Sequence, residues 1–342
     1  MKNCTLGHLT VSCTVLAWML SALHGPAQTP PAGPRGIGAR RPAPQPLSQA
    51  DGTSPASSPK YAFTVLDFPG TLYTNGFGIN SGAASSKVEI VGGIGTNVSD
   101  PIGYTGGFLM YYAETKSATT EIFRGVNIPG ATQQGASAVN DLGEIVGYYS
   151  DSSAAPQGYL QSGGTFTTIA VPFAGATWTE ADGINNSGEV VGYWLDATTS
   201  HGFLLSAGTY TSFDYPGAVF TVGNGINNLG EIAGFYGDTS GVYHGFSLSG
   251  GTYTSFDVPG SIATEAYGIN DAGDIVGIYC LTSKCFENFE TFEGFVSIGG
   301  SIATITIPGA TASGPSGIND NGVIAGVYYD AVGRHAFLAT PK

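Results

Sequence analysis

Residues 183–192, Gly-Ile-Asn-Asn-Ser-Gly-Glu-Val-Val-Gly, form the stretch that decides the fold, because versions of it recur six times. In each copy an asparagine follows an apolar residue, a short turn comes next, and an apolar run ends in glycine. The steps between the asparagines are 60, 45, 42, 43 and 49 residues, and the asparagines are Asn80, Asn140, Asn185, Asn227, Asn270 and Asn319. A period in the forties built from short strands predicts a radial or stacked β-array.

Each repeat is expected to contain four antiparallel strands, as residues 176–214 illustrate. The strands are expected at Thr177–Asn185, Glu189–Leu195, His201–Ser206 and Thr209–Asp214. The last two strands are separated by only two residues, which are Ala-Gly here and Gly-Gly in three other copies, a composition that favours a two-residue hairpin. Four antiparallel strands per repeat correspond to one blade of a β-propeller.

The two ends of the repeat region predict a closed ring. The final repeat stops after its third strand, at Phe337-Leu338, and residues 61–70 read as a lone fourth strand. We therefore expect an all-β, six-bladed propeller whose N-terminal strand pairs into the last blade and leaves no exposed edge. Small residues such as Ala181 and Gly183 place the first strand of each repeat innermost. An open β-solenoid is the alternative, but it gives no reason for complementary partial repeats.

The charge of the chain is unevenly distributed. The formal net charge is −14, with +4 in residues 1–60 and −18 in the remainder. So acidic a repeat domain repels phosphate backbones, which argues against nucleic acid as a partner. Cations such as calcium and neutral ligands such as sugars remain compatible, and the acidity also serves the solubility of a secreted protein.

The N-terminal region predicts export. Lys2 and the apolar stretch Val11–Leu23 are typical of a signal peptide over residues 1–27, and residues 28–60 read as a disordered linker rich in Pro, Ala and Ser. Residues 61–342 then form the propeller, with no membrane span after signal removal and as a monomer. The expected location is extracellular, periplasmic or at the cell surface. Cys280 and Cys285 predict one disulfide in such a compartment, with two free thiols as the alternative.

Three blades carry an Asp-His-Asp row across their last three strands. Counting outward from the Ala207-Gly208 turn sets a histidine opposite an aspartate, and a second aspartate ends the preceding strand. The same co-occurrence is found in three repeats, and its members are Asp196, His201 and Asp214; Asp238, His244 and Asp257; and Asp330, His335 and Asp67. A histidine between two carboxylates forms charge-assisted hydrogen bonds. We interpret the rows mainly as structural, with a ligand- or cation-binding ring as the alternative.

The fifth repeat has the most unusual loop. Aromatic and acidic side chains follow the two cysteines, a composition that suits sugar stacking or a protein contact. The candidate ligand-binding residues are Phe286, Phe289, Glu290, Phe292 and Glu293. The alternative is a loop that folds its aromatic side chains back over the blade.

The phrase His335-Ala336-Phe337-Leu338, with its variants at His201 and His244, accompanies the Ile-Asn phrase in the repeats. This pairing resembles the HAF family of extracellular bacterial repeats over roughly residues 61–340. The three other copies depart from it, with Gly106, Gln157 and Glu293 at the histidine position. The resemblance implies secretion and a propeller-like domain, and it implies nothing about catalysis.

The sequence favours a secreted binding or interaction module that uses its loop-rich face for a glycan, a cation or a protein. Two alternatives stay open, a structural cell-surface protein and an extracellular glycan hydrolase or lyase. The enzyme hypothesis depends on Glu180, Asp182 and Glu265, which lie on the expected innermost strands. No nucleophile–base pair stands out, so we assign no catalytic residue, no metal ligand and no cofactor beyond a compatible calcium ion.

Overall fold

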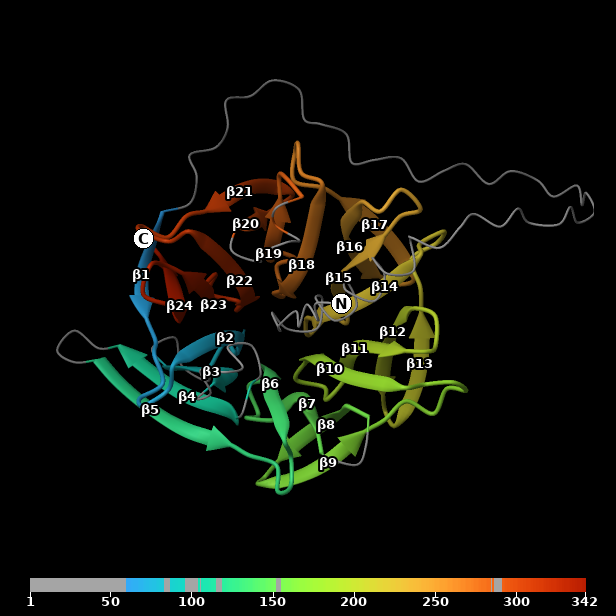
Figure 1. Cartoon of the computed structure of the whole chain (residues 1–342), viewed down its shortest axis with the longest axis horizontal. Helices are drawn as coiled ribbons and strands as arrows, with labels where there is room; N and C mark the ends of the chain where they lie inside the picture. Colours follow the sequence, from blue (N-terminus) through green and yellow to red (C-terminus); the bar gives the residue numbers. More distant parts are fainter. Residues whose placement is uncertain are drawn as a thin grey trace, which may run out of the picture.

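The computed structural model describes residues 60–82, 87–95, 104, 106–114, 119–151, 155–283, 285 and 291–342. Every regular element named in these residues is a β-strand, and the strands form a ring of six blades around one axis (Figure 1). The predicted all-β, six-bladed propeller is confirmed. The expected signal peptide and the expected linker up to residue 59 lie outside the described residues.

The first strand of each blade lies next to the axis and the second strand packs outside it (Figure 1). The first strands are β2 (Tyr73–Ile79), β6 (Gln133–Val139), β10 (Trp178–Ile184), β14 (Phe220–Ile226), β18 (Ala263–Ile269) and β22 (Ala312–Ile318). The second strands are β3 (Lys87–Gly95), β7 (Ile145–Ser150), β11 (Val190–Leu195), β15 (Ile232–Gly237), β19 (Ile275–Cys280) and β23 (Ile324–Tyr329).

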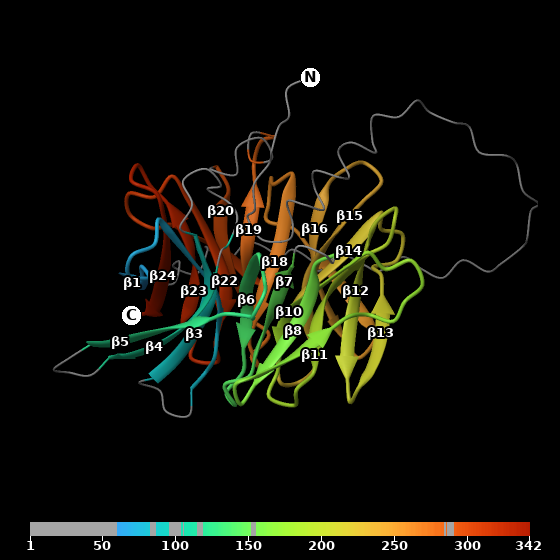
Figure 2. The same ribbon diagram turned by 60° about the horizontal axis from the view of Figure 1, so that its bottom comes forward.

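The third and fourth strands form the outer half of each blade. The third strands are β4 (Gly106–Glu114), β8 (Gln157–Ser162), β12 (Ser200–Ser206), β16 (Tyr243–Ser249), β20 (Glu293–Ile298) and β24 (Arg334–Pro341). The fourth strands are β5 (Thr119–Val126), β9 (Thr165–Ile169), β13 (Thr209–Phe213), β17 (Thr252–Phe256), β21 (Ser301–Ile305) and β1 (Tyr61–Val65). The β4–β5 hairpin extends beyond the ring (Figure 2). Blades four and five share a parallel bridge between Tyr243 and Ala263, so they count as one continuous sheet.

The ring closes as predicted. Strand β1 pairs antiparallel with β24, from Tyr61 opposite Pro341 to Val65 opposite Phe337. The backbone N–H of Leu66 donates to Ala336 at 2.9 Å, and the Leu66 side chain is buried in the core. Figure 1 shows β1 at the outer side of the last blade, next to β24. Segments about 270 residues apart in the sequence thus complete one sheet.

The inner strands approach one another so closely that side chains are excluded at some positions. A Cβ atom on Gly183 would lie 2.7 Å from the backbone oxygen of Asn224, and one on Gly317 would lie 2.7 Å from that of Phe77. Real Cβ atoms do not tolerate such contacts, so glycine is required there. The expectation that the small-residue strand lies innermost is therefore correct.

The third strands supply several of the largest core side chains. Phe203, Phe246 and Phe337, from the His-x-Phe phrases, are each at most 1% exposed. They pack between blades; Phe203, for example, joins Val146 and Ala181 in one apolar cluster. The His-x-Phe motif is therefore repeated because its phenylalanine fills the space between each blade and the neighbouring blade.

Candidate functional site

The repeated asparagines form a closed ring of hydrogen bonds around the axis. The Nδ2 of each asparagine donates to the backbone oxygen of the corresponding asparagine in the next blade at 2.9–3.2 Å, and Asn319 donates to Asn80 to close the circle. Within a blade, Oδ1 of Asn185 accepts the backbone N–H groups of Ser187 and Glu189. One buried side chain therefore fixes its own turn and the next blade, which explains the repeated phrase.

A second ring of hydrogen bonds surrounds the same axis and is formed by the residues that directly follow the repeated asparagines. Each backbone N–H of this position donates to a side-chain oxygen of the same position in the next blade at 2.7–3.1 Å. Its members are Ser81, Asp141, Asn186, Asn228, Asp271 and Asp320. Because their polar atoms are engaged with one another, we interpret this ring as part of the scaffold.

A β-bulge interrupts every inner strand at the same place. The pairing register shifts by one residue, for example between Ala181 and Gly183, and leaves one extra residue in each blade. All six extra residues line one hollow on the axis, and they are Phe77, Ser137, Asp182, Asn224, Tyr267 and Ser316. A bulge changes the direction of a side chain, so the six bulge residues turn their side chains toward the axial hollow. We call this set the bulge ring.

The bulge ring differs from its surroundings in one informative way. The neighbouring Ile-Asn phrase is nearly identical in all blades, whereas the bulge residue is aromatic twice, a hydroxyl twice, an amide once and a carboxylate once. Positions that hold the ring together repeat, while these positions do not. The variation marks the bulge ring as the part of the channel that is free to serve a ligand.

Blade three places two carboxylates at this level. Glu180 is 1% exposed, and its Oε2 accepts the Tyr193 hydroxyl at 2.7 Å and the Trp178 indole N–H at 3.2 Å. Burial raises the pKa of Glu180 to about 8, although these two hydrogen bonds oppose the shift. Burial also raises the pKa of Asp182 well above its usual range, and the charge of Glu180 adds to the effect. The two groups therefore lie close together in a poorly solvated place.

Several buried oxygens here have no hydrogen-bond partner in the part of the chain that the structure describes. They are Oε1 of Glu180, Oδ2 of Asp182 and Oγ of Ser137. Ser137 occupies the bulge position of the adjacent blade, so it lines the same hollow as Asp182. Unpartnered buried oxygens are costly, and two of the three, those of Ser137 and Asp182, belong to residues that line the axial hollow, which is a feature of a binding site rather than of a filled core.

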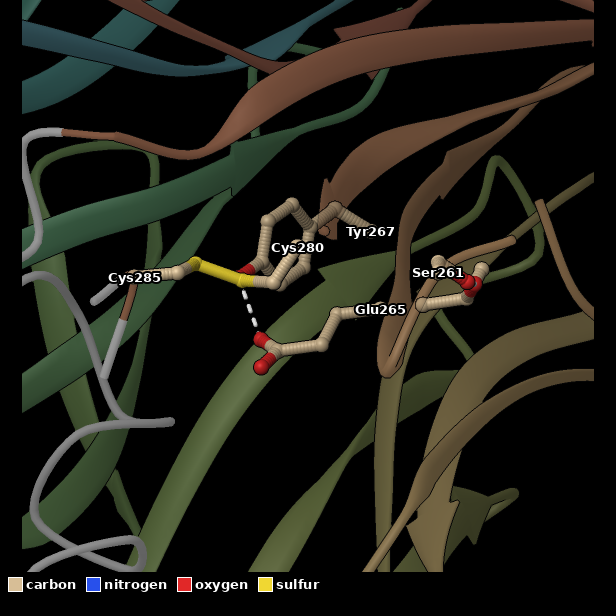
Figure 3. Close-up of a disulfide and its surroundings, with 6 residues drawn as sticks. Ser261, Glu265, Tyr267, Cys280 and Cys285 are labelled. Atoms are coloured by element: carbon tan, nitrogen blue, oxygen red, sulfur yellow. Dashed lines mark hydrogen bonds between the residues drawn. A yellow bond between two sulfur atoms is a disulfide. The ribbon is translucent and has the colours of Figure 1, made fainter. Parts of the chain in front are cut away.

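Glu265 occupies the position in blade five that Glu180 occupies in blade three. Its Oε2 accepts the Tyr267 hydroxyl at 2.6 Å, and both residues lie beside the Cys280–Cys285 disulfide (Figure 3). The predicted disulfide is thus present, with its Cα atoms 5.8 Å apart. Neither Glu180 nor Glu265 is among the residues that line the axial hollow. The acid close to Glu180 is Asp182, on the same strand, and not Glu265 as the enzyme hypothesis required.

The loop of blade five gives a correction. Phe292 was expected among exposed stacking residues, but it is 1% exposed and packs edge-on against Tyr329, with ring centroids 5.7 Å apart. Its apolar ring thus completes the core beside the disulfide, as in the fold-back alternative. Glu293 is exposed and accepts the Tyr279 hydroxyl at 2.6 Å. Phe286, Phe289 and Glu290 lie outside the described residues, so their role as ligand-binding residues stays a prediction.

The three Asp-His-Asp rows assemble at the outer part of their blades. His201 Nδ1 lies 3.0 Å from Asp214 and its Nε2 lies 3.6 Å from Asp196, and His244 repeats this with Asp257 and Asp238. In the last blade His335 Nδ1 lies 2.8 Å from Asp67, across the ring closure, and Nε2 lies 3.4 Å from Asp330.

Each histidine of the rows also stacks on an aromatic side chain of the second strand, namely Trp194, Tyr236 or Tyr328. In blade five the Tyr279–Glu293 pair takes the same place. The rows thus tie strands together, which supports their structural interpretation.

The Asp196 carboxylate, at the turn that precedes β12, predicts a loss of stability in acid. Hydrogen bonds from the Thr198 hydroxyl and backbone lower the pKa of Asp196 to about 2. Because this pKa lies below the ordinary value of about 3.9, the stabilisation is complete above about pH 4 and is lost as the pH falls toward 2. Asp196 is partly exposed, so solvent screening reduces the expected contribution to about 1 kcal/mol.

Urea unfolding at pH 2–6 measures this contribution. Asp196→Asn keeps the turn's hydrogen-bond acceptor and should flatten the pH dependence of the unfolding midpoint between pH 4 and 2. A variant whose acid response equals that of the unchanged protein would show that Asp196 does not stabilise the blade.

Sequence reasoning located part of the axial site and missed the rest. Glu180, Asp182 and Glu265 were recognised as acids on the inner strands, whereas Ser137, Asn224 and the other bulge residues were not singled out. The usable signal was the residue three positions before each repeated asparagine. It varies among otherwise similar copies.

Comparisons with known proteins find solved structures of similar fold but no family for this chain. No family model and no curated protein matches the chain, so the resemblance to the HAF family stays a prediction. Among solved structures, a mutant of AofleA from Arthrobotrys oligospora is 12% identical with a TM-score of 0.47, covering 82% of this chain and 86% of its own. A fungal lectin from Aleuria aurantia with a six-bladed propeller and a fucose recognition mode is 13% identical with a TM-score of 0.41, covering 80% and 97%.

A third similar structure is TolB from Acinetobacter baumannii, which is 10% identical with a TM-score of 0.42 and covers 78% of this chain and 54% of its own. Propellers serve unrelated functions, so likeness at these levels does not assign one. None of the described residues forms a helix with the length and apolar character of a membrane span. The function is therefore argued from the residues of this chain.

Proposed function

We propose that this protein is an exported carbohydrate-binding module and that the bulge ring is its site. The observation that carries the proposal is the set of six side chains, of five residue types, that the bulges direct into one axial hollow. Sites for small polar ligands combine apolar or aromatic surfaces with a few convergent polar groups. Phe77 and Tyr267 supply rings for the C–H faces of a sugar, and Ser137, Asp182 and Asn224 supply groups for its hydroxyls.

The charge of the repeat domain favours a neutral ligand. Residues 61–342 carry a net −18, so an anionic ligand would be repelled. A monosaccharide or the end of a glycan chain offers several hydroxyls that both donate and accept hydrogen bonds. Such a ligand satisfies the unpartnered oxygens of Ser137 and Asp182. The disulfide is compatible with an extracellular setting, where such ligands are found.

A glycan array followed by calorimetry tests this proposal. Ser137→Ala removes a hydroxyl that has no partner among the described residues, so folding should be unchanged while glycan affinity falls about fivefold. Asp182→Asn replaces a carboxyl oxygen with an amide nitrogen and should lower affinity by a similar factor, because one hydrogen-bond acceptor is lost. Asp214→Asn, at the outer rows, is the matched control and should bind like the unchanged protein.

Two results would overturn the site. One is the absence of any glycan ligand for the exported protein, and the other is a ligand that both axial variants bind with full affinity. In the second case Phe289→Ala identifies whether the blade-five loop binds instead, as the sequence first indicated. Trp178, next to Glu180, provides a fluorescence signal for the same titrations.

A further inference from the structure

The acid pair of blade three lacks a compensating positive charge. The ion pairs in the described part of the chain all join a histidine to an aspartate in the outer rows, and none involves Glu180 or Asp182. Two neighbouring carboxylates in a poorly solvated place are expensive to ionise unless a cation is close.

The adjacent blade contributes a third unpartnered oxygen, on the same axial hollow that Asp182 lines. Ser137 is 9% exposed, and its Oγ has no partner among the described residues. Ser137 and Asp182 both line the axial hollow, and they occupy the same bulge position of the neighbouring strands β6 and β10. Glu180 lies two residues before Asp182 and has its Oε1 equally unpartnered. The free atoms of this cluster are therefore all oxygens.

We propose that Asp182, Glu180 and Ser137 bind a calcium ion at the edge of the axial hollow. Carboxylate and hydroxyl oxygens are the ligands that hard cations prefer, and calcium tolerates irregular geometry with waters or ligand hydroxyls completing its shell. No histidine or cysteine belongs to the set, which disfavours zinc. Because only two of the three ligands are charged, the dissociation constant should lie on the order of 10⁻⁴–10⁻³ M, the range of extracellular calcium modules. This site goes beyond the proposed glycan binding and does not require it.

Thermal unfolding of the chelator-treated protein, without any glycan, tests the proposal with calcium chloride as the only added ligand. The melting temperature should rise by roughly 3 °C at about tenfold excess over the dissociation constant. Asp182→Asn and Glu180→Gln should abolish the rise, each judged against its own melting temperature without metal. Magnesium chloride should produce a smaller rise, since magnesium demands a stricter geometry.

Glu265→Gln is the matched control, because Glu265 is an equally buried acid at the same position of blade five with Tyr267 in place of a second carboxylate. It should respond to calcium like the unchanged protein. If either acid variant melts too early to be scored, calorimetric titration of Ser137→Ala with calcium replaces it and should show weaker binding. An unchanged melting temperature up to about 10 mM calcium, tenfold above the expected range, would overturn the proposal, and so would an undiminished response in Asp182→Asn. Measuring glycan binding in chelator keeps this failure separate from a failure of the glycan site.

Discussion

A chain that begins at Thr71, and so lacks β1, is expected not to form a stable monomeric propeller. Removing β1 takes away the fourth strand of the last blade, the buried Leu66, and the Asp67–His335 pair. A single buried leucine is worth about 2–5 kcal/mol, and the whole strand exceeds the net stability of about 5–15 kcal/mol expected for a domain. The bare edge of β24 would also invite association. Circular dichroism and size-exclusion chromatography measure both effects.

A chain that begins at Lys60 is the matched control, because it loses only the residues expected to form the signal peptide and linker. It should unfold cooperatively as a monomer. A synthetic peptide of residues 60–70, added to the shorter chain, should restore folding by completing the sheet. If the chain from Thr71 unfolds at the same denaturant concentration as the control, closure by β1 does not hold the ring together.

Replacing Asn185 with alanine is expected to lower the free energy of unfolding by about 4 kcal/mol. The side chain is buried and makes four hydrogen bonds: two to its own turn, one to Glu189 Oε2 and one to the backbone oxygen of Asn227 in the next blade. Each lost bond costs about 1 kcal/mol, and a stranded partner costs more. Urea unfolding followed by tryptophan fluorescence gives the free energy directly.

Two further variants separate the contribution that Asn185 makes to its own turn from its contribution to the ring of hydrogen bonds around the axis. Asn185→Asp keeps the oxygen that accepts the turn N–H groups but places a carboxylate beside Glu189, so it should also destabilise the protein. Asn186→Ala removes two hydrogen bonds with Asp141, but at an exposed position where water replaces them, so it should cost at most about 1 kcal/mol. Equal losses for Asn185→Ala and Asn186→Ala would contradict a special role for the inner ring.

Much of the architecture could be predicted from the sequence, because six copies of one repeat can be compared with one another within a single chain. Turn composition at Ala207-Gly208 set the register, which placed Ser206 opposite Thr209 and His201 beside Asp214 as found. Complementary partial blades, one strand at the N-terminal end and three at the C-terminal end, predicted the pairing of β1 with β24. Glycine in the inner strands indicated crowding at the axis. All these features depend on local patterns of turn and strand residues.

The candidate site could be predicted only in part, because it depends on a backbone irregularity and on packing across blades. Side chains on a regular strand alternate between its two faces, so the sequence did not indicate that a bulge would turn Asp182 and Ser137 toward the axial hollow. The repeated asparagine was understood as a turn residue, and its bond to the next blade requires three dimensions. Likewise, the composition of the blade-five loop could not show whether an aromatic ring is exposed for ligand stacking or buried in the core, as Phe292 is.

The repeated residues are expected to hold the ring together, and the bulge residues are expected to bind the ligand. Hydrogen–deuterium exchange with and without a glycan selected on the array separates these two roles. The glycan should slow exchange in the inner strands around the bulge ring, above all in β6, β10 and β18. Slowed exchange confined to the blade-five loop or to the outer Asp-His-Asp rows, with the inner strands unchanged, would contradict this expectation.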